Sequence, residues 1–337
     1  MIEDIEIVDY KGFKNLKLEN LSQVNIISGE NNIGKTALLE ALFLNNNILI
    51  EYKLFDKIVL LQQFLFIATT RDIQENRIKK YLKNVNFIVH SNELKLDIKY
   101  KSTYEFNENE KEEVKNFNQD YSGFIVGYTN SKLNLLPIDD ITTHNIMNSN
   151  IMSYNYIDSS KPINKRLVKL YSAIQSDGIQ QKFLTYLKLL DSDIQWIEPQ
   201  LLDDEMLLRL NLNNPERSLV SSELGEGTNR YIEILCTLLS SSNRTVFIDE
   251  IENGIHYTKL YDIWKAIIEI VQKENIQLFV TTHDSESIEA LNRASEDMQF
   301  DKISSITLER DEDNIIYPIV RKYSSFTATV DSGMDIR

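Results

Sequence analysis

Residues 29–36 have the residue types and spacing that bind phosphate. Two glycines, with four residues between them, are followed by a lysine and a threonine. The glycines let the backbone curl so that successive N–H groups point at phosphate oxygens, the lysine places a cation at the β- and γ-phosphates, and the threonine hydroxyl ligates Mg²⁺. The pattern predicts a P-loop that binds ATP with Mg²⁺ and consists of Gly29, Glu30, Asn31, Asn32, Ile33, Gly34, Lys35 and Thr36.

A second group that suits phosphate chemistry ends an apolar strand predicted at 245–249. Two acids, Asp249 and Glu250, close the strand. In an enzyme with a P-loop, the first acid holds Mg²⁺ together with the loop threonine, here Thr36, and a following carboxylate can polarise the attacking water as a general base. Apolar strands also end in solvated carboxylates without a function. The upstream P-loop favours the catalytic interpretation, with Asp249 as metal ligand and Glu250 as base.

His283 follows a third apolar strand, predicted at 277–282. One helix separates this strand from Asp249, and a right-handed crossover of that length makes the two strands near neighbours in a parallel sheet. We therefore expect His283 to reach the γ-phosphate. A histidine at a strand end is more often a capped surface residue, so this assignment depends on the predicted proximity.

The stretch 221–230 combines serines and two glycines directly before a helix predicted at 228–241. A helix N-terminus with small residues presents N–H groups and a partial positive charge to an anion. The alternative is an ordinary helix cap with flexible glycines. Only 10 of the 337 residues are glycine, so this chain uses little glycine in ordinary turns, and the stretch predicts a second phosphate contact.

Strands and helices alternate around these motifs. Three short strands are predicted within 1–28, a helix at 35–44 follows the P-loop, and apolar residues at helical spacing cover 163–190. Such alternation predicts an α/β fold with a mostly parallel, covered sheet, an antiparallel N-terminal β part and an inserted α/β region. The remaining elements are strands at 194–197, 206–212, 303–309 and 314–321 and helices at 258–273 and 285–293.

Length and composition limit the function classes. At roughly 150 residues per domain, 337 residues form two domains or one large domain with an insertion. We expect 1–46 and 161–337 to form the main domain and 47–160 an inserted subdomain. A single cysteine excludes a disulfide framework and indicates a reducing, cytoplasmic location. No run of 18 apolar residues occurs, which predicts no membrane span.

The net charge of −15 argues against tight, autonomous DNA binding, because nucleic-acid binders usually carry a basic balance or stripe. DNA binding would need a local basic patch and would be weak and strongly salt-dependent. Two clusters are candidates, although basic clusters of this kind are more often solvated helix faces. They are Arg77, Lys79, Lys80 and Lys83, and Lys161, Lys165, Arg166 and Lys169.

The order of these motifs resembles the ABC-type ATPase heads of the RecF, SMC and OLD group of AAA-family ATP-binding proteins. Residues 10–14 enter the P-loop strand as such chains do, residues 249–256 match their Walker B motif and D-loop, and residues 281–283 match their switch histidine. The similarity covers 1–46 and 160–337. It implies a P-loop NTPase fold with an ABC-type head. Because 47–160 shows no heptads and only 54 residues follow His283, we expect neither coiled-coil arms nor a Toprim nuclease domain.

The resemblance also implies a role for the stretch before the helix. In the family, this signature segment contacts the γ-phosphate of ATP held by the partner subunit, a role that falls here on Ser222, Gly225 and Gly227. Two residues interrupt the usual Leu-Ser-Gly-Gly order, so Ser221 and Ser222 both remain candidates for the hydroxyl. The glutamine of the family's Q-loop has no assigned position in this chain.

By this resemblance we expect a Mg²⁺-dependent ATPase that forms a homodimer around ATP and controls a separate effector, a nuclease or toxin, in bacterial anti-phage or abortive-infection defence. The alternative is a RecF-like ATPase of DNA repair or recombination, which a basic surface would favour. A third interpretation, a nucleotide-controlled scaffold with negligible turnover, conflicts with the presence of Glu250.

Overall fold

The computed structural model describes residues 1–52, 86–91, 95–102, 105–115, 123–129, 132–137, 155–214, 216, 218–240 and 245–333. At its centre is a six-stranded sheet with the strand order β15-β14-β3-β13-β12-β8. All neighbours run parallel except β15, which pairs antiparallel with β14 at one edge. The predicted mostly parallel sheet is therefore confirmed. Its strands are β3 (Val24–Gly29), β8 (Tyr156–Ile157), β12 (Thr245–Ile248), β13 (Gln277–Thr281), β14 (Ile303–Arg310) and β15 (Ile316–Lys322).

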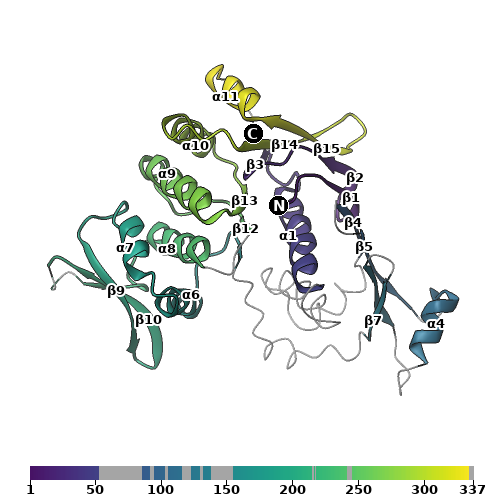
Figure 1. Cartoon of the computed structure of the whole chain (residues 1–337), viewed down its shortest axis with the longest axis horizontal. Coiled ribbons are helices and arrows are strands. Elements are labelled where there is room, and N and C mark those ends of the chain that lie inside the picture. Colours follow the sequence, from purple (N-terminus) through teal and green to yellow (C-terminus); the bar gives the residue numbers. More distant parts are fainter. Residues whose placement is uncertain are drawn as a thin grey trace.

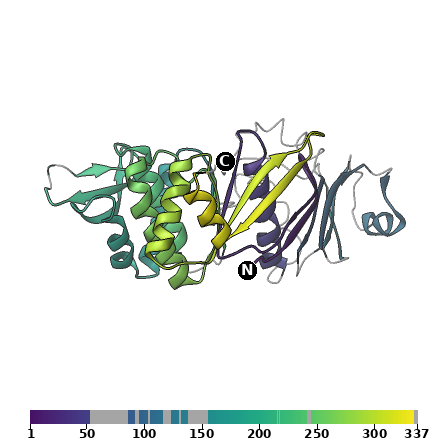
Figure 2. The same cartoon turned by 90° about the horizontal axis from the view of Figure 1, so that it is seen from above.

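Helices cover both faces of the central sheet, and alternate residues of each strand supply two separate cores. Val246 and Leu278 pack with the helices α8, α9 and α10, while Phe247 and Phe279 pack with α1. Figures 1 and 2 show α1 on the opposite side of the sheet from α8–α10. Strands that are apolar on both faces are what such a covered parallel sheet requires. These helices are α1 (Lys35–Tyr52), α8 (Glu226–Leu239), α9 (Tyr257–Glu274) and α10 (Ser285–Asp297), with α11 (Tyr323–Asp331) after β15.

A second six-stranded sheet is antiparallel, in the order β2-β1-β4-β5-β6-β7. Pairing of β4 with β1 joins the inserted strands directly to the N-terminal hairpin. The inserted region thus extends the N-terminal sheet, although Phe106, Phe124 and Val126 form a small core of its own. The elements are β1 (Ile5–Tyr10), β2 (Phe13–Leu18), β4 (Asn86–Ser91), β5 (Lys95–Lys101), α4 (Glu108–Val114), β6 (Phe124–Thr129) and β7 (Lys132–Pro137).

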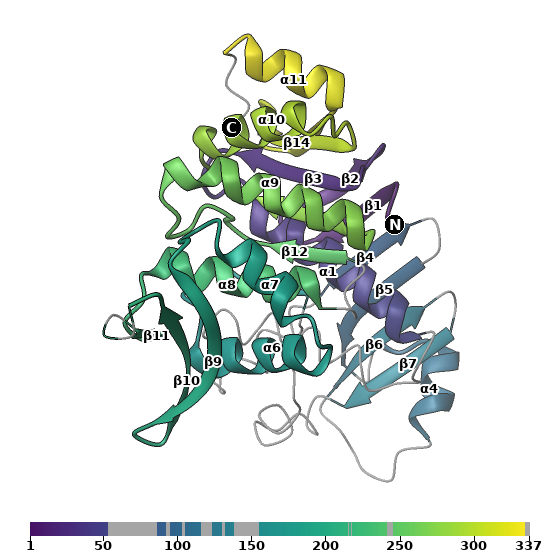
Figure 3. The same ribbon diagram turned by 60° about the vertical axis from the view of Figure 1, so that its left-hand side comes forward.

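A third sheet, with the order β11-β10-β9, lies beside α6 and α7 (Figure 3). Ile197 and Leu210 of this sheet pack into the same core as Leu167 and Tyr171 of α6. The chain leaves this layer after β11 and then forms α8. Its elements are α6 (Asn164–Ser176), α7 (Gln180–Leu187), β9 (Ile194–Leu202), β10 (Glu205–Leu212) and β11 (Leu219–Val220).

The expected division of the chain can be compared with these elements. Residue 46 falls inside α1, and β8, which lies within 47–160, belongs to the central sheet. Both ends of the inserted region are therefore built into the main body. Among the helices of the described ranges, none is both long and apolar enough to cross a bilayer.

The stacked rings between the central sheet and α1 provide a test of this arrangement. Phe279 lies nearly parallel to Phe247, with ring centroids 5.4 Å apart, and is fully buried. Phe279→Ala removes the ring, so we expect the free energy of unfolding to fall by about 3–5 kcal/mol in urea titrations. The control Leu201→Ala truncates a side chain that is 63% exposed and should change it by less than about 0.5 kcal/mol. Equally small effects would contradict the burial of this face.

Candidate functional site

The candidate site lies at the carboxyl ends of β3, β13 and β12, which are neighbours in the central sheet. The parallel register aligns Thr281 with Ile27, so the loops after the strands leave from one edge. These loops carry the P-loop, the acids Asp249 and Glu250, and His283. In open parallel sheets, ligands bind outside the carboxyl ends of the strands. The predicted proximity of the two later strands is confirmed, because β13 pairs directly with β12.

The P-loop connects the last residue of β3 to the first turn of α1. Gly29 has a φ of +141°, and a Cβ there would lie 2.8 Å from the carbonyl oxygen of Leu308, so only glycine fits. The Lys35 ammonium lies inside the loop and donates to the carbonyl oxygens of Gly29 at 2.8 Å and Glu30 at 3.0 Å. Burial lowers the pKa of Lys35, while three nearby carboxylates act in the opposite direction. The loop thus holds a cation where the pattern expects phosphate.

Asp249 is buried at the centre of the site and contacts hydroxyl groups of two neighbouring elements. Thr36 Oγ1 lies 3.1 Å from each carboxylate oxygen, and Thr281 Oγ1 donates to Oδ1 at 2.6 Å. Burial raises the pKa of Asp249, and the two threonine hydrogen bonds oppose this shift. Mg²⁺ prefers oxygen ligands and is usually held by one or two carboxylates together with substrate phosphates. The oxygens of Thr36 and Asp249 fit such an ion.

Glu250 follows Asp249 in a backbone conformation that side-chain-bearing residues rarely adopt. Its φ is +50°, and its N–H donates to Thr281 Oγ1 at 2.8 Å. Asn253 Nδ2 donates to Glu250 Oε2 at 2.9 Å and to the carbonyl oxygen of Ser159 at 2.8 Å. Backbone strain of this kind costs about 1–3 kcal/mol and persists where surrounding contacts hold it, often at functional sites. A partly exposed carboxylate that can accept a proton is thereby held beside Asp249.

His283 contacts an acid to which the sequence patterns assign no role. Its backbone N–H donates to Glu252 Oε1 at 2.9 Å, and its Nδ1 lies 2.9 Å from the same oxygen. The imidazole is 45% exposed, whereas the Glu252 side chain is 8% exposed. The contact depends on the pairing of β12 with β13, and no local pattern in the sequence could have revealed it.

The signature segment separates into residues that face solvent and residues that serve packing. Ser222 and Gly225 are exposed, and Gly225 caps α8 with open space around its Cα. The Ser221 hydroxyl is bound internally, donating to Asn164 Oδ1 at 2.8 Å and accepting from the Leu208 N–H at 3.2 Å. Of the two candidate serines, Ser222 is therefore the one whose hydroxyl faces solvent.

Gly227 has a structural reason to be glycine. A Cβ at this position would lie 2.1 Å from the carbonyl oxygen of Gly254, in the loop after Asp249. The start of α8 is thus packed against the loop that carries the acids. Among the described residues, no hydrogen bond joins the segment 221–227 to the P-loop of the same chain.

Arg230 is a second residue that the sequence patterns missed. It is buried in α8 and donates to the carbonyl oxygens of Asp158 and Asp249, each at 2.5 Å, and to that of Glu250 at 3.4 Å. Burial lowers its pKa, and Glu233 is first among the acids that oppose this shift. The available signal was an arginine directly before the mostly apolar stretch 231–239. Arg230 ties the helix after the signature segment to the backbone of both acids.

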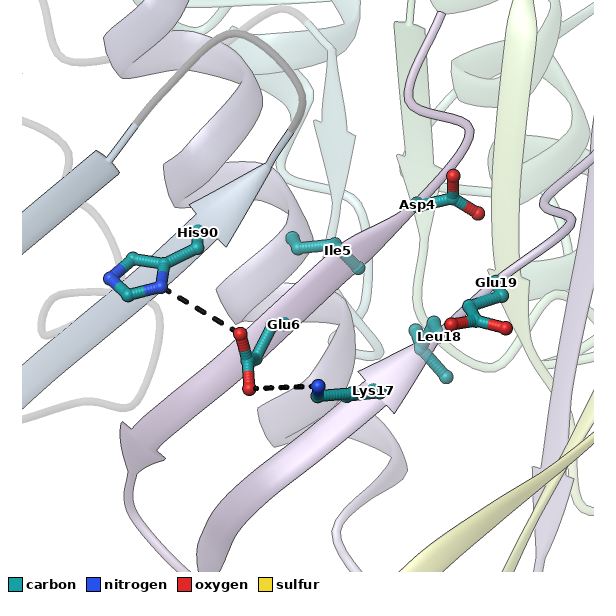
Figure 4. Close-up of a pocket in the computed structure, with 7 residues that line it drawn as sticks. All are labelled: Asp4, Ile5, Glu6, Lys17, Leu18, Glu19 and His90. Carbon is teal, nitrogen blue, oxygen red and sulfur yellow. Dashed lines mark ion pairs between the residues drawn. The ribbon is translucent and has the colours of Figure 1, made fainter.

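A separate depression of about 240 Å³ lies on the antiparallel sheet (Figure 4). It is distinct from the candidate site at the carboxyl ends of β3, β13 and β12. Glu6 at its centre lies 3.5 Å from Lys17 and 3.7 Å from His90, so opposite charges already meet within it. None of the predicted motifs contributes to it, and we assign it no function. Its lining consists of Asp4, Ile5, Glu6, Lys17, Leu18, Glu19 and His90.

Known proteins resemble this chain in sequence and in fold. An ATP/GTP phosphatase of Helicobacter pylori is 24% identical over 363 residues, which cover 94% of this chain and 95% of that protein. An uncharacterized protein of Methanocaldococcus jannaschii is 49% identical over 59 residues, 18% of this chain and 27% of that protein. The crystal structure of an Smc head bound to the C-winged helix domain of ScpA has a TM-score of 0.53 and 10% identity, covering 96% of this chain and 98% of that one.

This comparison shows that the fold of the chain is similar to that of an Smc head. A sequence family also spans the motifs described above, from the P-loop strand β3 through the signature segment and the acids to His283. The matched range is far more than half of the chain. The chain therefore belongs to the family described as "AAA domain, putative AbiEii toxin, Type IV TA system", which it matches over residues 24–289.

Proposed function

We propose that this protein is a Mg²⁺-dependent ATP hydrolase of the ABC type. The observation that carries the proposal is the contact of Thr36, in the P-loop, with the buried carboxylate of Asp249, after β12, at 3.1 Å. Two residues that are far apart in the sequence, and that would both bind the metal in this proposal, thus lie in contact. The Helicobacter pylori relative is named an ATP/GTP phosphatase, which supports the same type of reaction here.

Each candidate residue has a task in this reaction. Lys35 and the loop N–H groups bind the β- and γ-phosphates, and the N-terminus of α1 adds its partial positive charge. Thr36 and Asp249 would hold Mg²⁺, which would neutralise part of the phosphate charge. Glu250 accepts the proton of the water whose oxygen bonds to the γ-phosphorus as the bond to ADP breaks. His283 contacts the γ-phosphate oxygens.

Two copies pair around ATP in this proposal, with the signature segment of one copy on the nucleotide of the other. Ser222 and Gly225 are exposed directly before α8, and a helix N-terminus of this kind suits a phosphate. A two-fold arrangement uses each such contact twice. Because Gly227 packs against Gly254, we assign the contact in trans chiefly to Ser222 and Gly225.

The biological role that we propose is control of a separate effector, a nuclease or toxin, in bacterial anti-phage or abortive-infection defence. The description of the family, which names a putative toxin and a type IV TA system, supports this role. Pairing around ATP gives the head two states, and an effector that binds one of them better is switched by the nucleotide. We propose a cytoplasmic location, which the single buried cysteine, Cys236, fits.

The alternative, a RecF-like ATPase of DNA repair, needs a basic surface. The cluster at 77–83 lies outside the described residues. In the other cluster, Lys161 pairs with Glu226 at 3.2 Å and Arg166 with Glu233 at 2.5 Å, so internal carboxylates offset part of its charge. Together with the net charge of −15, these pairs disfavour tight DNA binding.

Lys35→Ala tests the nucleotide site. Loss of the ammonium should weaken Mg²⁺–ATP binding by at least about tenfold, or roughly 1.4 kcal/mol, in isothermal titration calorimetry. Thr36→Ala should weaken binding only when Mg²⁺ is present, because its hydroxyl acts through the metal. The control Lys273→Ala removes an exposed cation of α9 and should bind as the wild type does. Wild-type affinity in Lys35→Ala would remove the P-loop from the site.

Glu250→Gln tests the general base. The amide keeps the size of the side chain but does not accept a proton, so phosphate release should fall by about 10²-fold or more while ATP still binds. The control Glu269→Gln, on the surface of α9, should release phosphate at the wild-type rate. Turnover of Glu250→Gln at the wild-type rate would assign the base to another group.

Light scattering on Glu250→Gln tests the pairing. Uncleaved ATP should hold two copies together, so the mass should double when ATP is added. Gly225→Asp, introduced into the same protein, places a carboxylate against the γ-phosphate of the partner's ATP and should restore the monomer. The control Ser324→Asp adds the same charge to an exposed position of α11 and should leave the dimer intact. A mass that does not change when ATP is added contradicts the contact in trans. A dimer that persists with ATP after Gly225→Asp contradicts it as well.

A further inference from the structure

The buried carboxyl group of Glu252 is the unassigned feature of the site. Its Oε1 accepts the backbone N–H of His283 at 2.9 Å and lies 2.9 Å from Nδ1 of the same residue. Its Oε2 has no hydrogen-bond partner among the described residues. Burial raises the pKa of Glu252, and contacts with His283 and Thr282 act in the opposite direction.

Stability does not account for a glutamate at this position. A buried polar atom without a partner destabilises the fold, and a well-packed apolar side chain avoids that cost. Oε1 contacts both the backbone N–H and the imidazole of His283, while Thr282 also interacts with the carboxyl group. The contacts of Oε1 therefore orient this oxygen toward His283.

This arrangement selects one ring nitrogen of His283. The hydrogen bond made by one nitrogen of an imidazole sets which nitrogen carries the proton. The Glu252 carboxylate can only accept hydrogen bonds, so a proton on Nδ1 completes the contact with Oε1. Nε2 makes no hydrogen bond within the described chain, and the ring is 45% exposed. Nε2 is the nitrogen left for a ligand.

We infer that Glu252 is a positioning residue for His283, which holds the proton on Nδ1 and presents Nε2 to the terminal phosphate of ATP. Only the last step rests on the proposed function, because the contact between Glu252 and His283 involves residues of this chain alone. The loop after β12 then serves three parts of the site. Asp249 serves the metal, Glu250 the water and Glu252 the switch histidine.

The tautomer of His283 tests this inference without turnover. In protein labelled with ¹⁵N-histidine, long-range ¹H–¹⁵N correlation spectra distinguish a protonated Nδ1 from a bare one. The chain has 4 histidines, and His283→Asn identifies the signals of His283. We expect a protonated Nδ1 in the nucleotide-free wild type and a shift of the proton to Nε2 in Glu252→Ala. A bare Nδ1 in the wild type, or a spectrum unchanged in Glu252→Ala, overturns the inference.

Two conservative variants distinguish the effect of the length of the Glu252 side chain from the effect of its charge. Glu252→Gln keeps a carbonyl oxygen at the same reach and should keep the proton on Nδ1. Glu252→Asp keeps the charge, but it is one methylene shorter and should lose the contact. In ATPase assays, Glu252→Asp should lower kcat by up to about 10²-fold, as expected for a reacting group displaced by about 1 Å, with little change in KM. Rescue of kcat and of the tautomer by the same variant, Glu252→Gln, is the expected signature.

A double variant completes the test. If Glu252 acts through His283, adding Glu252→Asp to His283→Ala should cause no further loss of kcat, because coupled residues are not additive. Fully additive losses contradict the inference. Failure of the proposed function is distinguishable, since a protein without ATP hydrolysis still yields the tautomer result. Conversely, hydrolysis that depends on Lys35 and Glu250 but not on Glu252 rejects the inference alone.

Discussion

A carboxylate buried between two threonine hydroxyl groups is the constraint on which the site depends. Asp249 is 3% exposed, and its oxygens contact hydroxyl groups from the start of α1 and the end of β13. The described guanidinium closest in the sequence, that of Arg230, binds the carbonyl oxygen of Asp249 instead of its carboxylate. A divalent ion at these oxygens would offset the cost of burying the charge, and Thr36 and Asp249 are the residues that would hold it.

That contact requires long-range order of the whole central sheet. The contact forms because β3, β13 and β12 are parallel neighbours, which brings Asp249 close to Thr281. Thr36 joins them because α1 packs on the face of the central sheet that carries Phe247. Arg230 then links α8 to the backbone of the acids, and Gly227 packs the start of α8 against the same loop. A partner's nucleotide at the signature segment would therefore act on the loop that holds the base. This is a physical route by which pairing and hydrolysis can be coupled.

Sequence patterns predicted the parts of this site that local chemistry determines. The P-loop needs its glycines, lysine and threonine at fixed spacing, and the strand ends at Asp249 and His283 followed from an apolar strand and one crossover. Glu252 and Arg230 escaped prediction because their partners belong to other strands and become neighbours only in the folded sheet. The pairing of β4 with β1 escaped it for the same reason. The helix α11 has a single buried residue, Phe326, and so lacks the periodic apolar face that marks a helix.

A crystal structure of Glu250→Gln, grown with ATP and Mn²⁺ as a substitute for Mg²⁺, tests the central claim most directly. The anomalous signal of the metal locates it independently of the nucleotide density. We expect one metal peak per chain at the carboxyl ends of β3 and β12, within about 2.2 Å of Thr36 Oγ1 and beside the carboxylate of Asp249, with the γ-phosphate bound to the same ion. A metal and triphosphate bound away from Thr36 and Asp249 would contradict the account.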